Sequence, residues 1–179
     1  LREVRQLDLD GQGEVVFDGG TYRLREARGP LEVGLDGDKE VRRVRVEFRT
    51  PTEIKGARPG EAPEFGVLFA RIRDRISALC TLYGDGELGL NYREMGERAR
   101  AVRLVDEDVR HERVSRISSR TWERHSIGGF VGEVAYEGDL GEFLGFLKGG
   151  EWVGVGRHTV WGNGEMRVQF ALEAGHDSE

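Results

Sequence analysis

One long amphipathic segment, residues 63–83, constrains the fold more than any other part of the chain. Its apolar residues recur at helical spacing and form one stripe: Phe65, Leu68, Phe69, Ile72, Ile76, Leu79 and Tyr83. Gly84 follows directly, where a helix commonly ends. A stripe of this kind is typical of a helix that packs against a core on one side only. The segment therefore predicts a surface helix of an ordered domain.

The segments around this helix follow in an order that indicates an α+β fold. Before it, residues 41–48 alternate, with Val44, Val46 and Phe48 on one face, as in a half-buried strand. After it we expect a short helix over 91–101 and a long hairpin with strands over 103–118 and 127–136. A helix over 139–148, ended by Gly149 and Gly150, and a last strand from Trp152 and Val153 to Leu172 complete the order.

This β-α-β-β-α-β order is that of the ferredoxin-like fold, which is also the fold of RNA-recognition modules (RRM-like). Such a domain has an antiparallel sheet with its helices on one face. We expect it to span residues 41–179. Residues 1–40 indicate short strands, with a hairpin that turns at Gly19 and Gly20. We expect a β-rich extension or a linker there, from an N-terminal domain that precedes Leu1 in the whole protein.

The composition excludes several classes of protein. Apolar residues make up 37% and charged residues 34% of the 179 positions, a balance typical of globular and not of disordered chains. No apolar run approaches the roughly 20 residues of a transmembrane helix, and no signal peptide opens the chain. Cys80 is the only cysteine, so an internal disulfide is excluded. We therefore expect a cytoplasmic protein without a membrane partner.

The net charge of −6 disfavours a strongly basic nucleic-acid binder on average, but the cations are not evenly spread. Residues 110–125, the outer part of the expected hairpin, carry five arginines against Glu112 and Glu123, a local charge of +3: Arg110, Arg113, Arg116, Arg120 and Arg124. We expect its tip to contact an acidic partner. A solvated strand pair is the alternative.

Residues 154–164 hold two Gly-x-Gly pairs, Gly154 with Gly156 and Gly162 with Gly164, around Arg157 and His158. Glycine permits a positive φ and a close backbone approach, and successive N–H groups can hold a phosphate. A P-loop would need Gly-Lys-Ser/Thr leading into a helix, and a dinucleotide fingerprint would also open a helix. Residues 165–172 alternate like a strand instead. We expect a glycine-rich loop that approaches a partner with its backbone, the alternative being a plain turn.

Three features in this order resemble the C-terminal domain of the CRISPR-associated RAMP-superfamily endoribonuclease that cuts precursor CRISPR RNA within its repeats. They are the Arg-x-Ser-x-Arg run at 116–120, the Gly-Gly segment at 127–133, and the glycine-rich loop before the last strand. The resemblance covers residues 41–172. Asn163 departs from the family pattern, which prefers an apolar residue there.

The resemblance implies an RNA-binding domain with a role in antiviral defence, whose partners are CRISPR repeat RNA and other CRISPR-associated proteins. It implies RNA contacts from the hairpin and the loop: Arg113, Arg116, Ser118, Arg120, Arg124, Gly154, Gly156, Arg157, His158, Gly162 and Gly164. It also implies metal-independent hydrolase chemistry without a cofactor, by a histidine of the N-terminal domain. A non-catalytic RAMP subunit of an effector complex and a protein-binding β-rich domain stay open as alternatives.

Three histidines are candidates should this chain itself cleave RNA, because histidine titrates in the pH range that general acid–base catalysis requires. They are His111, His125 and His158, whereas His176 lies in a polar tail. Neither a metal-ligand spacing nor a Gly-x-Ser-x-Gly motif occurs. We expect the chain to bind RNA and not to cut it alone.

Overall fold

The structure is a computed structural model that describes residues 1–8, 11–29, 32–35, 37, 40–58, 60–84, 86–117, 120 and 122–170, with Arg124 and His125 described by their backbone alone. The chain divides into two compact units, Leu1–Gly34 and Leu35–Glu179. Each unit is described by itself below.

The first unit is a three-stranded antiparallel sheet. Its strands β1 (Glu3–Leu7), β2 (Gly13–Asp18) and β3 (Arg23–Leu24) lie in the order β1-β2-β3. The predicted hairpin turn at Gly19 and Gly20 is confirmed. Asp18 holds this turn because its carboxylate accepts hydrogen bonds from the Thr21 hydroxyl and the Gly20 N–H, at 2.8 and 2.9 Å. These bonds, that of Thr21 first, lower the pKa of Asp18.

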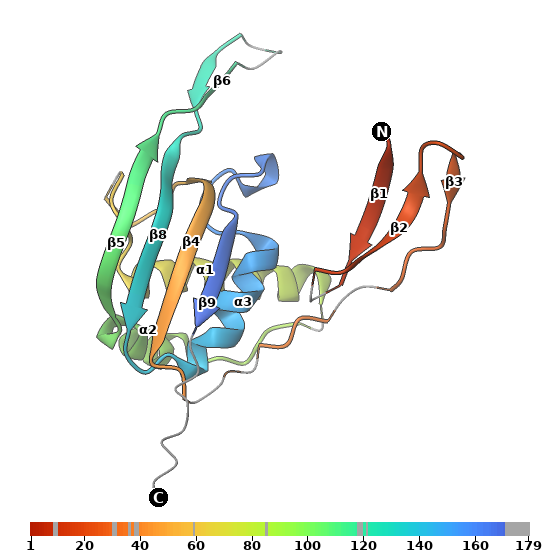
Figure 1. The fold of residues 1–179 in the computed structure, drawn as a ribbon. Coiled ribbons are helices and arrows are strands. Elements are labelled where there is room, and N and C mark those ends of the chain that lie inside the picture. Colours follow the sequence, from red (N-terminus) through yellow and green to blue (C-terminus); the bar gives the residue numbers. More distant parts are fainter. Residues whose placement is uncertain are drawn as a thin grey trace, which may run out of the picture. The chain divides into compact units, whose positions relative to one another are not determined.

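The second unit has the predicted α+β, ferredoxin-like architecture (Figure 1). Its sheet has the order β5-β8-β4-β9, with all neighbours antiparallel: β4 (Arg43–Thr52), β5 (Arg103–Glu112), β8 (Gly129–Glu137) and β9 (Met166–Phe170). The helices α1 (Phe65–Tyr83) and α3 (Leu144–Val153) lie on one face of this sheet, and α2 (Tyr92–Ala101) packs beside α1. None of the helices in the described ranges is both long and apolar enough to span a bilayer.

The core lies between the sheet and these helices. The alternation predicted for β4 is confirmed, since Val44, Val46 and Phe48 are buried. The ring of Phe65, at the start of α1, packs edge-on against Tyr136 of β8 and Phe143. The Tyr136 hydroxyl donates a 2.8 Å hydrogen bond to the carbonyl of Pro63, and burial raises the pKa of this phenol. The apolar stripe of α1 is buried as far as Ile76, whereas Tyr83 is exposed, unlike the prediction.

The start and the end of α3 differ from the prediction. A short 3-10 turn, Gly141–Phe143, precedes it, and the helix runs through Gly149 and Gly150 to Val153. Trp152 and Val153 are therefore helical and not the start of the last strand. The prediction that these two glycines end the helix is wrong, because they lie inside it and allow neighbouring side chains to pack closely. A Cβ on Gly149 would lie 2.9 Å from Cδ1 of Ile76, and one on Gly150 would lie 3.2 Å from Sδ of Met166.

The predicted long hairpin is confirmed. The strands β5 and β8 continue into a narrower ribbon formed by β6 (Ser115–Ile117) and β7 (Arg124–Ser126), which extends beyond the sheet (Figure 1). Arg116 pairs with His125 in this ribbon.

Candidate functional site

The glycine-rich loop, residues 154–164, closes on itself directly after α3. The N–H of Val155 donates to the carbonyl of Gly164 at 2.9 Å, and Val155 is fully buried. Two further bonds fasten the loop to the end of β4: Arg157 N–H to Glu53 O at 2.9 Å, and Gly164 N–H to Pro51 O at 3.2 Å. The loop is thus a rigid attachment to the sheet.

The glycines give this loop its shape. Gly154, Gly156, Gly162 and Gly164 all have φ between 68° and 88°, where residues with a Cβ are strained. A Cβ on Gly156 would also collide with the carbonyl oxygen of Glu53, and one on Gly164 with that of Val155. The N–H groups of Gly154, Gly162 and Gly164 donate to carbonyls of the protein. The prediction that these N–H groups face a partner is therefore wrong for these three.

Arg157 projects from the loop and forms an ion pair. Its guanidinium donates to the Glu53 carboxylate at 2.8 Å, and 64% of its side chain is exposed. An exposed pair of this kind contributes about 0–1 kcal/mol. A phosphate can therefore displace Glu53 from Arg157 at little cost.

A stack of three side chains joins the loop to the hairpin. The rings of His158 and Trp161 are parallel within 4°, with centroids 4.9 Å apart, and the guanidinium of Arg116 lies 4.7 Å from the centroid of Trp161. His158 adopts a left-handed backbone (φ 63°), which places it at the start of the 3-10 turn Thr159–Trp161. Residues 42 or more positions apart in the sequence thus form one surface.

Asn163 makes a second link between the loop and the hairpin. Its Nδ2 donates a 2.7 Å hydrogen bond to the carbonyl of Ile127, just before β8 begins. The residue that departs from the family pattern therefore has a structural role. An apolar side chain at this position could not make this bond.

The hairpin carries further cations besides Arg116. Arg113 and Arg120 are exposed, whereas Arg110 is paired with Glu112 at 3.0 Å. Ser118 lies outside the described residues, as do the side chains of Arg124 and His125 and the tail with His176. The predicted RNA contacts of the hairpin, those of Arg113, Arg116 and Arg120 included, therefore stay predictions.

A cleft of about 440 Å³ opens beside the loop and the base of the hairpin. Its wall includes Arg157, His111 of β5 and Ser126 of β7. Arg157 and His111 are candidates predicted from the sequence, whereas Ser126 is new. The segment 53–58 forms the other wall and adds Lys55 and Arg58. Three cations against Glu53 make this cleft suitable for an anionic ligand.

Sequence reasoning did not select Lys55, Arg58 or Trp161. The first two lie in a segment that the prolines and glycines marked only as a connection between β4 and α1. Lys55 directly precedes Gly56, and Arg58 lies between Gly56 and Gly60, so two cations in a glycine-containing connection were the available signal. For Trp161 the available signal was an aromatic residue inside a glycine-rich loop of a chain that also has an arginine-rich hairpin, since aromatic side chains can stack on RNA bases.

The structure separates the candidate histidines. His111 lines the cleft next to Gly60, whereas His158 is stacked on Trp161. Within the described ranges, no cluster of three or more His, Cys, Asp or Glu side chains has a metal-binding arrangement.

Comparisons with known proteins agree with this architecture. The family model of the CRISPR-associated endoribonuclease Cas6 matches residues 46–166, which is more than half of the chain. No curated protein matches the chain.

Several solved structures share the fold. A Cas6 of Thermus thermophilus has a TM-score of 0.55 at 18% identity, covering 73% of this chain and 54% of that one. A Cas6 product complex gives 0.56 at 18% identity, covering 89% and 64%. A partial Cas6-RT-Cas1–Cas2 complex gives 0.56 at 15% identity, covering 89% and 30%. The chain thus spans less than two thirds of the length of each of these proteins.

Proposed function

Since the chain belongs to the family of the CRISPR-associated endoribonuclease Cas6, we propose that it is the RNA-binding C-terminal domain of an enzyme that cuts precursor CRISPR RNA within its repeats. The observation that carries this proposal is the stack of Arg116, Trp161 and His158. It joins the arginine-rich hairpin and the glycine-rich loop into one cationic surface, here called the loop–hairpin surface.

The two parts of this surface have different roles in the proposal. The exposed guanidinium groups of Arg113, Arg116 and Arg120 bind phosphates, each adding about 0.7–0.9 to the slope of log affinity against log salt. Arg157 binds a phosphate by exchange with Glu53. The loop supplies a fixed platform rather than donors, because its glycine N–H groups are largely paired within the protein.

Cross-linking tests where the RNA lies. Repeat RNA with photoreactive uridines is irradiated on the full chain, and the cross-linked peptides are mapped by mass spectrometry. We expect cross-links in residues 113–126 and 154–164. Cross-links confined to Leu1–Gly34, or none above the level of an unrelated RNA of equal length, would contradict the proposal.

We further propose that this chain binds repeat RNA without cutting it, with the catalytic histidine in another domain of the whole protein. The stacking of His158 on Trp161 supports a positioning role for this ring. Labelled repeat RNA incubated with the chain in EDTA should stay intact while bound. A defined cut would contradict this, and its loss in His111→Ala, His125→Ala or His158→Ala would identify the group responsible.

Other CRISPR-associated proteins are the second class of partner in this proposal. One solved structure with this fold is part of a Cas6-RT-Cas1–Cas2 complex. The matching measurement is co-purification of the chain with the Cas proteins of the same genome after RNase treatment.

A further inference from the structure

A second group of cations lies on the side of the sheet that the helices cover. The groove between α1 and α2, here called the helical groove, has small residues in its wall, Gly66 and Ala70 of α1 and Gly96 of α2. Its other lining residues are Arg71, Arg73, Tyr92, Arg93, Glu97 and Arg100. Neither the family resemblance nor the loop–hairpin surface accounts for four arginines there.

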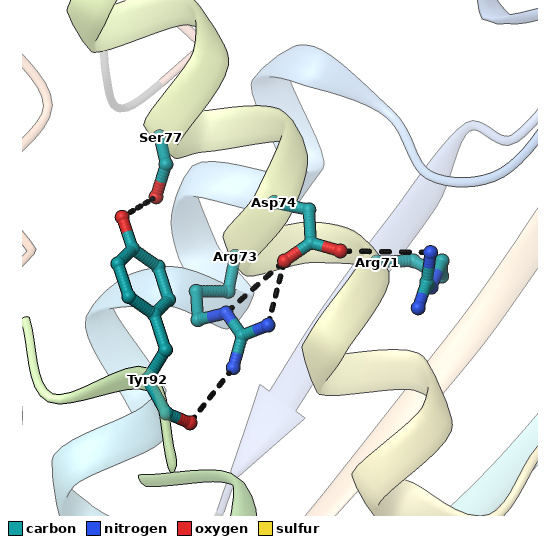
Figure 2. A network of polar contacts seen from close by, with 5 residues as sticks. All are labelled: Arg71, Arg73, Asp74, Ser77 and Tyr92. Carbon is teal, nitrogen blue, oxygen red and sulfur yellow. Dashed lines mark hydrogen bonds and ion pairs between the residues drawn. The ribbon is translucent and has the colours of Figure 1, made fainter.

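Arg73 is a structural member of this group (Figure 2). It donates to Oδ1 of Asp74 at 2.6 and 3.2 Å and to the carbonyl of Tyr92 at 3.2 Å. Its guanidinium also lies 4.8 Å from the centroid of the Tyr92 ring, and only 13% of the side chain is exposed. The Tyr92 hydroxyl bonds Ser77 at 3.0 Å, which fixes α2 on α1. Arg73 therefore uses three of its five N–H donors inside the protein and is largely buried, so it serves mainly to hold α2 on α1.

Arg71 and Arg100 are held much more loosely. The terminal nitrogen of Arg71 is 3.5 Å from Oδ2 of Asp74, longer than a good charged hydrogen bond, and that carboxylate is shared with Arg73. Nε of Arg71 is buried and has no hydrogen-bond partner among the described residues. Arg100 lays its aliphatic stem on Gly66, whose Cβ would lie 3.1 Å from Cγ of Arg100. Within the same described ranges, Arg100 has no ion pair.

The helical groove continues toward the cleft beside the loop–hairpin surface. An adjoining hollow shares Gly66, Ala70, Arg71 and Arg100 with the groove, and it shares Lys55 and Gly56 with the cleft. The groove and this hollow hold Lys55, Arg71, Arg73, Arg93 and Arg100 against Glu64 and Glu97, and with Asp74, the partner of Arg71 and Arg73, the local charge is +2 in a chain of net charge −6. A cationic path thus leads from the base of the hairpin around segment 53–58 to the helices.

We propose that the helical groove binds the phosphodiester backbone of single-stranded RNA that flanks the segment held by the loop–hairpin surface. This inference rests on the proposed function. Arginine forks match phosphate oxygens, and among the groove's arginines Arg71 and Arg100 are the two that no ion pair shorter than 3.5 Å holds in the described part of the chain. Because the groove is continuous with the cleft, a single RNA strand can occupy both. An acidic protein segment would not account for this continuity. The bases face solvent, so binding there is independent of sequence.

The test uses the full chain and two RNAs, the repeat RNA and the same RNA extended by ten uridines at its 5′ or 3′ end. The variant is Arg71→Gln with Arg100→Gln. The matched control is Arg42→Gln with Arg103→Gln, which removes two exposed arginines, paired with Asp139 and Glu137, outside the groove. One of the two extensions should raise the affinity of the wild type and its salt slope by about 1.4, for two single-strand phosphate contacts. The variant should lose this gain and keep its affinity for the unextended repeat, whereas the control should keep both.

Each other outcome contradicts the inference in its own way. An extension that gives the wild type no gain, or a gain that the variant retains, removes the groove from RNA binding while the proposed function stands. A deca-glutamate peptide that competes with the uridine extension as strongly as free ten-uridine RNA assigns the groove to an acidic protein segment. A wild type that binds neither RNA contradicts the proposed function and this inference together. Arg100→Gln alone should lose about half of the gain in salt slope. Because Arg100 is exposed, this single variant should fold, and it tests the inference even if the double variant does not fold.

Discussion

The guanidinium of Arg116 lies 4.7 Å from the centroid of the Trp161 ring, although the two residues belong to different elements 45 positions apart in the sequence. This contact makes the hairpin and the glycine-rich loop one surface. A cation over an indole face contributes about 0.5–1 kcal/mol at an exposed site. It is weak enough for an RNA phosphate to compete for Arg116.

Removing the indole should separate the two parts of the surface. We expect Trp161→Ala to weaken repeat-RNA binding several-fold with little change in melting temperature, because Trp161 is half exposed. Trp161→Phe, which keeps an aromatic face for Arg116 and His158, is the matched control and should retain most of the affinity. Equal losses in both variants would show that the stack does not position the hairpin.

The hairpin arginines should bind through charge. Arg113→Gln with Arg120→Gln should lower the slope of log affinity against log salt by about 1.4–1.8, since each lost phosphate contact removes 0.7–0.9. A titration of binding by fluorescence anisotropy at four salt concentrations measures this slope. The control is again Arg42→Gln with Arg103→Gln, and an equal change of slope in both pairs would point to overall charge instead.

Two glycines of the loop should respond differently to alanine. Gly156→Ala forces a Cβ into the carbonyl oxygen of Glu53 at a positive φ, so we expect a loss of several kcal/mol in the free energy of unfolding. Gly162→Ala meets no atom within 4 Å and bears only the cost of its positive φ, about 1–2 kcal/mol. Urea unfolding of both variants checks the order. A Gly162 variant as unstable as the Gly156 variant would contradict the assignment of a close backbone approach to Gly156 and not to Gly162.

The Tyr136 hydroxyl should stabilise the core. Tyr136→Phe removes the bond to Pro63 and leaves its buried carbonyl without this donor, so we expect a loss of about 1–2 kcal/mol. Affinity for RNA, measured well below the melting temperature, should stay unchanged, because Tyr136 is buried in the core. A variant as stable as the wild type would mean that the carbonyl finds another donor.

The fold was predictable because its signals are local. The alternation of Val44, Val46 and Phe48 and the helical stripe from Phe65 to Ile76 each follow from the period of one element. The end of α3 was not predictable. Two adjacent glycines usually indicate the end of a helix, but Gly149 and Gly150 lie inside α3 and pack closely against Ile76 and Met166, which belong to other elements.

The candidate site was predictable only in its two separate parts. The hairpin arginines and the glycine-rich loop were visible in the sequence, whereas the stack of Arg116 on Trp161 and the bond from Asn163 to Ile127 depend on the way the sheet brings the two together. The N–H groups of Gly154 and Gly164 donate to carbonyls of α3 and β4, outside the loop, so the glycine pattern alone could not distinguish a phosphate-binding loop from a fixed platform.

Comparing repeat RNA with a shuffled RNA of the same length and composition tests the central claim most directly. Both RNAs carry the same charge, so a titration of the full chain at 150 mM salt separates recognition from general attraction to phosphates. The account predicts that the repeat binds at least about tenfold more tightly, a difference of about 1.4 kcal/mol, and that Trp161→Ala reduces this preference. Equal affinity for the two RNAs, or no binding of either, would contradict it.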